Sequence, residues 1–201
     1  MFITLEGIDG SGTTTQVQRL ADGLRAQKHA VTTTFEPSEG RIGTLIREAL
    51  QQQALQHHDG RPDPRMLALL FAADRIDHLR TIVQPALARG EIVISDRYVH
   101  SSLAYQGAQL DDRWVDAINA GAQRADLVLW LDVPVETCLA RVASRGQTRE
   151  IFEHKEMLLA VKARYERAMH LRPERVQRID GTGEVDAVAA RILAAVTAHL
   201  A

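Results

Sequence analysis

The stretch FITLEGIDGSGTT, from Phe2 to Thr14, carries the pattern that decides the fold. Its first residues, Phe2–Leu5, form a short apolar run that predicts a buried strand. The segment Gly7–Thr14 follows and matches the frame G-x-x-x-x-G-K-[ST] at every position except the lysine. A helical pattern beginning near Thr15 completes the strand–loop–helix context that this phosphate-binding motif requires.

The loop has the parts that a phosphate and its metal ion need. Glycines let backbone N–H groups turn inward around a phosphate, and the following helix N-terminus adds partial positive charge. The Thr14 hydroxyl can ligate Mg²⁺, and Asp96 follows the predicted strand Ile92–Ser95, where a second Mg²⁺ ligand is expected. The alternatives are a glycine-rich turn that only connects strand to helix, and an aspartate that only serves a turn.

The lysine position of the motif is occupied by Thr13. One such contact is commonly worth about 3 to 4 kcal/mol to a phosphoryl transfer, so other groups must replace it. Arg141 and Arg145 are four residues apart and share a helix face, and Arg149 lies beyond a glycine hinge. We predict a short arginine-bearing lid over residues 141–153 that partly compensates for Thr13. A solvated helix end is the alternative for each arginine.

Strands and helices alternate along the chain. Between the apolar runs lie segments of helical period, and this alternation implies right-handed crossovers and a parallel sheet. The further predicted strands are Val31–Phe35, Ile92–Ser95, Leu127–Leu131 and Val176–Ile179.

Apolar residues at helical spacing mark the first and the last helix. Longer helical patterns cover Pro64–Arg89, with Pro85 near the end, and Ile151–His170. The polar segment Gln51–Asp63 predicts a loop, and its adjacent histidines lack the spacing of a metal site. The apolar positions of the two amphipathic helices are Val17, Leu20, Ala21 and Leu24, and Val185, Val188, Ala189, Ile192, Val196 and Leu200.

Length and charge narrow the class of protein. The 201 residues predict a single domain over 1–201, and 24 basic against 26 acidic residues give a net charge of −2. This balance argues against a nucleic-acid-binding face and a polybasic membrane surface. The single cysteine, Cys138, cannot form an internal disulfide, and the N-terminus has no signal-peptide or membrane-span pattern. We therefore expect a cytoplasmic protein with no membrane or nucleic-acid partner.

Motifs in a fixed order resemble the thymidylate kinase family through nearly the whole chain. They are Gly7–Gly12, Leu70–Arg75 (LFAADR), Asp96–Gly107 (DRYVHSSLAYQG) and Asp126–Pro134 (DLVLWLDVP). The resemblance implies a three-layer P-loop α/β fold, whose five-stranded parallel sheet has the order 2-3-1-4-5 and is flanked by helices. It also implies Mg²⁺-dependent transfer of the ATP γ-phosphate to dTMP, giving dTDP and ADP in dTTP biosynthesis, and a homodimer.

On the acceptor side, the chemistry of the residues agrees with this resemblance. Phe71 and Arg75 share a helix face, which suits a ring stacked on a pyrimidine beside a guanidinium that reaches base or phosphate. The resemblance implies that Arg97 binds the acceptor monophosphate and that Asp9 accepts a hydrogen bond from the sugar 3′-hydroxyl. It also places Tyr105 and its neighbours around thymine and sugar. Without the resemblance Phe71 would be assigned to the core, and a buried helix tyrosine is the alternative for Tyr105.

The predicted site divides into four groups of residues. The catalytic group is Asp9, Arg97, Arg145 and Arg149. The ATP-binding group is Gly7, Ile8, Asp9, Gly10, Ser11, Gly12, Thr13, Thr14, Arg141 and Arg145. The dTMP-binding group is Asp9, Phe35, Pro37, Phe71, Arg75, Arg97, Ser102, Tyr105 and Gln106. The metal group is Thr14 and Asp96.

Two departures from the family pattern keep alternatives open. Thr13 replaces the lysine, and Phe35 stands where an arginine frequently precedes Glu-Pro. A catalytically impaired nucleotide-binding protein of the same fold is one alternative, and a kinase for another nucleoside monophosphate, such as dUMP, is a second. A GTP-driven switch is disfavoured because it needs Asn-Lys-x-Asp, and the only asparagine, Asn119, precedes Ala120.

Overall fold

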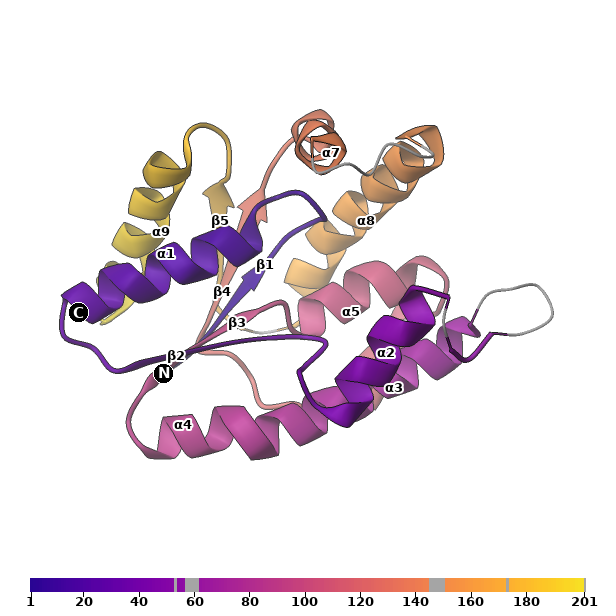
Figure 1. Cartoon of the computed structure of the whole chain (residues 1–201), viewed down its shortest axis with the longest axis horizontal. Coiled ribbons are helices and arrows are strands. Elements are labelled where there is room, and N and C mark those ends of the chain that lie inside the picture. The colour runs from indigo at the N-terminus through magenta and orange to yellow at the C-terminus, as the bar shows by residue number, and fades with distance from the viewer. Residues whose placement is uncertain (53, 57–61, 145–150, 173, 201) are drawn as a thin grey trace.

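A parallel sheet forms the centre of the fold in the computed structural model, which describes residues 1–52, 54–56, 62–144, 151–172 and 174–200, with the backbone alone for 151–154 (Figure 1). Within these residues the sheet has five strands in the order β2-β3-β1-β4-β5, so the predicted topology is confirmed. Each strand lies where the apolar runs predicted it. The strands are β1 (Phe2–Glu6), β2 (Val31–Phe35), β3 (Ile92–Asp96), β4 (Leu127–Asp132) and β5 (Val176–Asp180).

The register of the sheet brings three strand ends together. Leu5 of β1 and Phe35 of β2 both lie beside Asp96, the last residue of β3. The chain segments that leave these strands therefore start from one edge of the sheet. In parallel α/β folds this carboxyl edge is where ligands bind.

The two faces of the sheet are buried by different helices, because side chains alternate along each strand. Leu129 and Leu131 of β4 join the core under α1 (Thr13–Ala26) and α9 (Val185–Leu200), which pack together on one face (Figure 1). Val17, Leu20 and Leu24 of α1 are buried there, as predicted. Val188, Ile192 and Val196 form the buried stripe of α9, whereas Val185 and Leu200 in its terminal turns are exposed, contrary to prediction.

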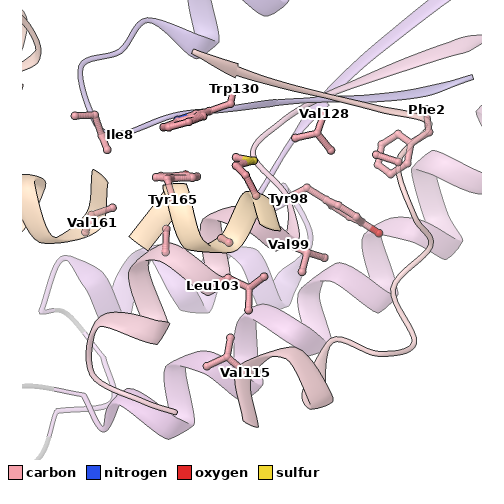
Figure 2. Close-up of a cluster of buried hydrophobic side chains, with 14 of the residues drawn as sticks. Phe2, Ile8, Tyr98, Val99, Leu103, Val115, Val128, Trp130, Val161 and Tyr165 are labelled. Atoms are coloured by element: carbon pink, nitrogen blue, oxygen red, sulfur yellow. The ribbon is translucent and has the colours of Figure 1, made fainter. Parts of the chain in front are cut away.

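The opposite face carries the larger core. Phe2, Val128 and Trp130 of the sheet pack there against side chains of α5 and α8, including Leu103 and Tyr165 (Figure 2). The helices on this side of the sheet pack either on it or on one another. They are α3 (Pro64–His78), η1 (Leu79–Val83), α4 (Gln84–Ala88), α5 (Val99–Tyr105), η2 (Gln106–Ala108), α6 (Asp112–Ile118) and α8 (Ile151–Leu171).

The long helical pattern Pro64–Arg89 is confirmed with one irregularity. Its middle, Leu79–Val83, is a π-helical turn just before Pro85, which has no N–H to donate. Asp63 starts α3, because its side chain accepts the N–H groups of Arg65 and Met66. The described part of the predicted loop 51–63 contains no helix, and His57 and His58 lie outside the described residues.

The sequence patterns did not separate the short helices. α2 (Arg41–Leu50), α5 and α6 were not predicted individually, because seven to ten residues give few turns in which a periodicity can appear. α7 (Val135–Ala143) carries Arg141 and ends before Arg145. Among the described residues, no helix is long and apolar enough to cross a membrane.

Candidate active site

The phosphate loop, Gly7–Thr14, has a conformation that requires its glycines. Gly10 and Gly12 have φ of 84° and 96°, in the left-handed region that side chains disfavour. A Cβ at Gly10 would lie 2.5 Å from the carbonyl oxygen of Cys138. No side chain among the described residues caps α1 at Gly12, so the first N–H groups of the helix stay open to an anion.

The predicted metal ligands meet at the carboxyl edge of the sheet. The Thr14 hydroxyl donates to Asp96 Oδ2 at 2.5 Å, and Asp96 is buried. The other carboxylate oxygen, Oδ1, is buried with no hydrogen-bond partner among the described residues. A hydroxyl and a carboxylate are hard oxygen donors, and Mg²⁺ commonly takes one or two protein ligands while phosphates and waters complete its shell. The donor set therefore fits Mg²⁺.

Arg141 is the predicted lid arginine that the structure describes. Its guanidinium donates to the carbonyl oxygens of Ser11, at 3.0 Å, and Gly10, at 3.4 Å. It therefore lies against the outside of the phosphate loop. Arg145 and Arg149 lie outside the described residues, so compensation for Thr13 by the lid stays a prediction.

Arg97 follows β3 directly and has an unusual backbone. Its φ of 70° is left-handed for a residue with a side chain, a strain that concentrates at functional sites. Its Nη2 donates to Asp9 Oδ1 at 2.6 Å and its Nη1 to the Gly7 carbonyl at 2.9 Å. The guanidinium lies over the Tyr105 ring, 5.2 Å from the centroid. The structure thus brings together two of the predicted catalytic residues, Asp9 and Arg97.

A cavity of about 320 Å³ opens beside Arg97, and we call it the Phe71 cavity after the ring at its wall. Eight of the nine residues predicted to bind dTMP line it. These are Asp9, Pro37, Phe71, Arg75, Arg97, Ser102, Tyr105 and Gln106. Sequence reasoning did not single out its other lining residues, which are Glu36, Leu50, Tyr98, Ser101 and Met157.

Phe35 is the predicted residue that does not line the Phe71 cavity. It lines a neighbouring cleft of about 790 Å³ together with Thr14 and Asp96. Its chain neighbours Thr34 and Glu36 line the same cleft. Its predicted contact with dTMP stays a prediction.

Arg75 shares a helix face with Phe71, as predicted, but its guanidinium is bound by the protein. Glu36 Oε2 accepts from its Nε at 2.9 Å and from its Nη2 at 2.6 Å. Asn119 Oδ1 accepts from Nη1, and Ser102 Oγ accepts from Nη2 at 3.1 Å. An arginine has five N–H donors, so these four bonds leave one for a ligand. The protein therefore holds most of the Arg75 guanidinium, and its predicted contact with base or phosphate stays a prediction.

Glu36 lies at the centre of a buried network that the sequence did not reveal. Its Oε1 is 3.2 Å from His78 Nδ1, and His78 Nε2 is 2.6 Å from the Thr34 hydroxyl. Asp74 accepts both the N–H and the hydroxyl of Ser38, which fixes the next turn of the chain. The sequence signal that could have indicated this network is the polar residues on the buried face of α3, because buried polar groups without partners are costly.

Two further polar groups are set into the cavity wall. Gln106 Oε1 is buried and has no hydrogen-bond partner among the described residues, so it can receive a donor from a ligand. The Tyr105 hydroxyl accepts the backbone N–H of Asp9 at 3.0 Å, which ties the phosphate loop to α5. Burial raises the pKa of Tyr105, and this keeps the phenol neutral.

Glu6 is the functional candidate that sequence reasoning missed altogether. It ends β1, is fully buried, and accepts a 2.5 Å hydrogen bond from the Ser101 hydroxyl. Burial raises the pKa of Glu6 from its ordinary 4.5 to about 7, although Ser101 and the charge of Arg97 act in the opposite direction. A charged residue inside the apolar run before Gly7 was the signal that could have identified it.

Comparisons with known proteins find chains similar to this one along most of its length. The family model described as thymidylate kinase matches residues 5–192. A thymidylate kinase from Syntrophotalea carbinolica is 39% identical over 203 residues, covering 95% of this chain and 92% of the relative. A probable thymidylate kinase from Pyrococcus horikoshii is 42% identical over 175 residues, covering 86% and 84%. One from Thermococcus kodakarensis is 37% identical over 203 residues, covering 96% of each chain.

Proposed function

The chain belongs to the thymidylate kinase family, and from that premise we propose that it transfers the γ-phosphoryl group of ATP to dTMP. One observation carries the proposal: Arg97 lines both the Phe71 cavity and the neighbouring cleft that Thr14 and Asp96 line, and it donates to the Gly7 carbonyl of the phosphate loop. A donor phosphate held by the loop and an acceptor phosphate held by Arg97 would therefore be neighbours. Such positioning supplies most of the catalysis in phosphoryl transfer.

On the donor side, backbone N–H groups of the loop would hold the ATP phosphates. Thr14 and Asp96 would hold Mg²⁺, with the unpartnered Asp96 Oδ1 as an available ligand atom. When bound, Mg²⁺ would neutralise negative charge on the transferring group. Arg141 would stabilise the loop from outside through Ser11, and the predicted lid arginines, Arg145 and Arg149, would supply the charge that Thr13 lacks.

On the acceptor side, Arg97 would bind the dTMP phosphate and Phe71 would stack on thymine. Gln106 and the remaining N–H of Arg75 are available to hydrogen-bond the edge of the base. Asp9 would accept a hydrogen bond from the sugar 3′-hydroxyl. An oxygen of the dTMP phosphate would attack the γ-phosphorus, the bond to the β–γ bridging oxygen would break, and ADP would leave. This oxygen is already ionised near neutral pH, so no general base is needed.

We also propose that the protein acts as a homodimer in the cytoplasm. The helix α3 exposes Leu69 and Ile76, each about half accessible, on one face. Two large apolar side chains seven residues apart on a surface helix support an interface between helices. The cytoplasmic location rests on the single cysteine and on the nucleotide substrates.

The experiment that tests the function is ADP formation from ATP and Mg²⁺ with dTMP, dUMP, CMP and AMP offered singly. Parallel reactions use Thr13→Lys, and a reaction without acceptor measures ATP hydrolysis. Turnover selective for dTMP in the parent protein is the expected result. Activity that appears only in Thr13→Lys would mean that the parent protein has lost kinase activity with the lysine. No ADP formation in either protein would overturn the proposal.

A further inference from the structure

Next to Arg97, three polar side chains meet inside the protein. Ser101 Oγ lies 2.5 Å from Glu6 Oε2 and 2.7 Å from the Tyr165 hydroxyl. The Tyr165 hydroxyl also donates to Glu6 Oε2 at 3.3 Å. We call Glu6, Ser101 and Tyr165 the Glu6 cluster. It joins β1, α5 and α8, which are far apart in the sequence.

Tyr165 differs from the other aromatic residues of this region because it is not part of the cavity wall. It is fully buried in α8, among the hydrophobic side chains of the larger core (Figure 2). Its ring packs edge-on against Tyr105, with centroids 6.2 Å apart and an interplanar angle of 89°. Burial, reinforced by the nearby Glu6 carboxyl, raises the pKa of Tyr165 well above its usual range, so its hydroxyl keeps its proton.

The Glu6 cluster holds one edge of the Arg97 guanidinium. Nη1 of Arg97 donates to the Gly7 carbonyl at 2.9 Å and also points at the Tyr165 and Ser101 hydroxyls, at 3.3 and 3.4 Å. Nη2 contacts Asp9, whose side chain is 46% exposed and can be displaced by a bound anion. With the Nη1 edge fixed to the protein, the Nη2 edge is the one presented to a ligand.

We propose that Tyr165 is a positioning residue: together with Glu6 and Ser101, it holds Arg97 in the orientation that binds the acceptor phosphate. The inference rests on the proposed function, because it assumes that Arg97 binds that phosphate. It assigns a role to a tyrosine on α8 that has no place in the cavity. The ring of Tyr165 supports Tyr105, and its hydroxyl sets the direction of Arg97.

The test is Tyr165→Phe, which keeps the ring and removes the hydroxyl. Calorimetric titration of the parent and the variant with dTMP and with thymidine separates phosphate binding from nucleoside binding. We expect dTMP to bind about threefold to tenfold more weakly to the variant, the range for one lost hydrogen bond. Thymidine should change by less than about twofold, because it has no phosphate for Arg97 to hold. The KM for dTMP should rise while the KM for ATP stays unchanged.

Thr4→Val is the matched control. Thr4 lies in β1, as Glu6 does, and its buried hydroxyl has no hydrogen-bond partner among the described residues. Removing this hydroxyl should leave the ratio of dTMP to thymidine affinity at the parent value. A loss of dTMP affinity in Thr4→Val as large as in Tyr165→Phe would show a general effect of the core and overturn the proposal.

A double-mutant cycle with Arg97→Ala completes the test. If Tyr165 acts through Arg97, Tyr165→Phe should have no further effect on dTMP binding once Arg97 is absent. Equal weakening of dTMP and thymidine, or an effect that persists without Arg97, would overturn the proposal. If the parent protein binds dTMP no more tightly than thymidine, the assumed role of Arg97 is wrong, and the inference is overturned with it. Sound dTMP binding without turnover would count against the proposed function alone.

Discussion

Around the phosphate loop the available groups are backbone atoms of one short segment, whereas the Phe71 cavity is walled by side chains from many elements. The loop depends on local conformation, with left-handed glycines at positions 10 and 12. The cavity depends on long-range pairs such as Arg75 with Glu36, which lie 39 residues apart. A substitution in the loop should therefore weaken nucleotide binding there, whereas a substitution in the network behind the cavity should lower the stability of the whole fold.

The largest expected effect is on stability, from Glu36→Ala. This change leaves Arg75 and His78 buried without their carboxylate, and breaking a buried ion pair typically costs about 3 to 5 kcal/mol. Urea unfolding should show this loss in the free energy of unfolding. The exposed pair of Arg19 and Asp186 gives the contrast, and Asp186→Ala should leave the denaturation midpoint almost unchanged. Equal midpoints for the two variants would contradict the comparison.

Gly10→Ala should damage the loop without damaging the cavity. The new methyl group would meet the Cys138 carbonyl in a backbone conformation that alanine disfavours, at a cost of about 1 to 3 kcal/mol. We expect ATP to bind at least about tenfold more weakly, while dTMP binds as it does in the parent. Calorimetry with each nucleotide measures both affinities. Parallel losses for ATP and dTMP would mean that the two regions are not independent.

Glu6→Gln should change how stability depends on pH. The unfolded Glu6 carboxyl ionises near 4.5, whereas the buried one keeps its proton up to about 7, so ionisation destabilises the folded state. This penalty is absent below pH 4.5, grows between 4.5 and 7, and is complete above 7. Glutamine removes it. The variant should therefore gain about 1 to 3 kcal/mol in unfolding free energy relative to the parent between pH 5 and pH 8.

Denaturant melts of both proteins at the two pH values provide the measurement. A difference between parent and variant that is the same at pH 5 and pH 8 would show that Glu6 does not titrate in this range. The Glu6 cluster would then contain a carboxyl group whose charge is the same at both pH values.

The smallest expected effect comes from Gln106→Ala. Its buried Oε1 has no hydrogen-bond partner among the described residues, so the substitution leaves stability nearly unchanged. If this oxygen accepts a hydrogen bond from the base, the KM for dTMP should rise about twofold to tenfold, the value of one hydrogen bond. The KM for ATP is the internal control. An unchanged KM for dTMP would remove Gln106 from the base site.

The same difference between the two regions explains what the sequence could predict. The phosphate loop, the Thr14–Asp96 pair and the strand order were predictable, because local motifs and a family resemblance carry them. The hydrogen bonds between Arg75 and Glu36, the position of Phe35 at the neighbouring cleft and the pKa of Glu6 were not. These depend on which side chains the fold brings together, and spacing along the chain does not encode that.

The short helices could not be predicted for a related reason. α2 and α6 have ten and seven residues, too few turns to reveal a periodicity. The exposure of Val185 and Leu200 at the ends of α9 could not be read from an apolar stripe, because a stripe does not say where its partner helix stops. Tertiary packing decides both features.

The most direct measurement is the fate of a radioactive γ-phosphoryl group when [γ-³²P]ATP, Mg²⁺ and dTMP are incubated with the protein. The account predicts labelled dTDP, with much less label transferred to CMP or AMP. Label that appears only as inorganic phosphate, or that stays in ATP, would contradict the claim that the loop and the Phe71 cavity together form a dTMP-phosphorylating site.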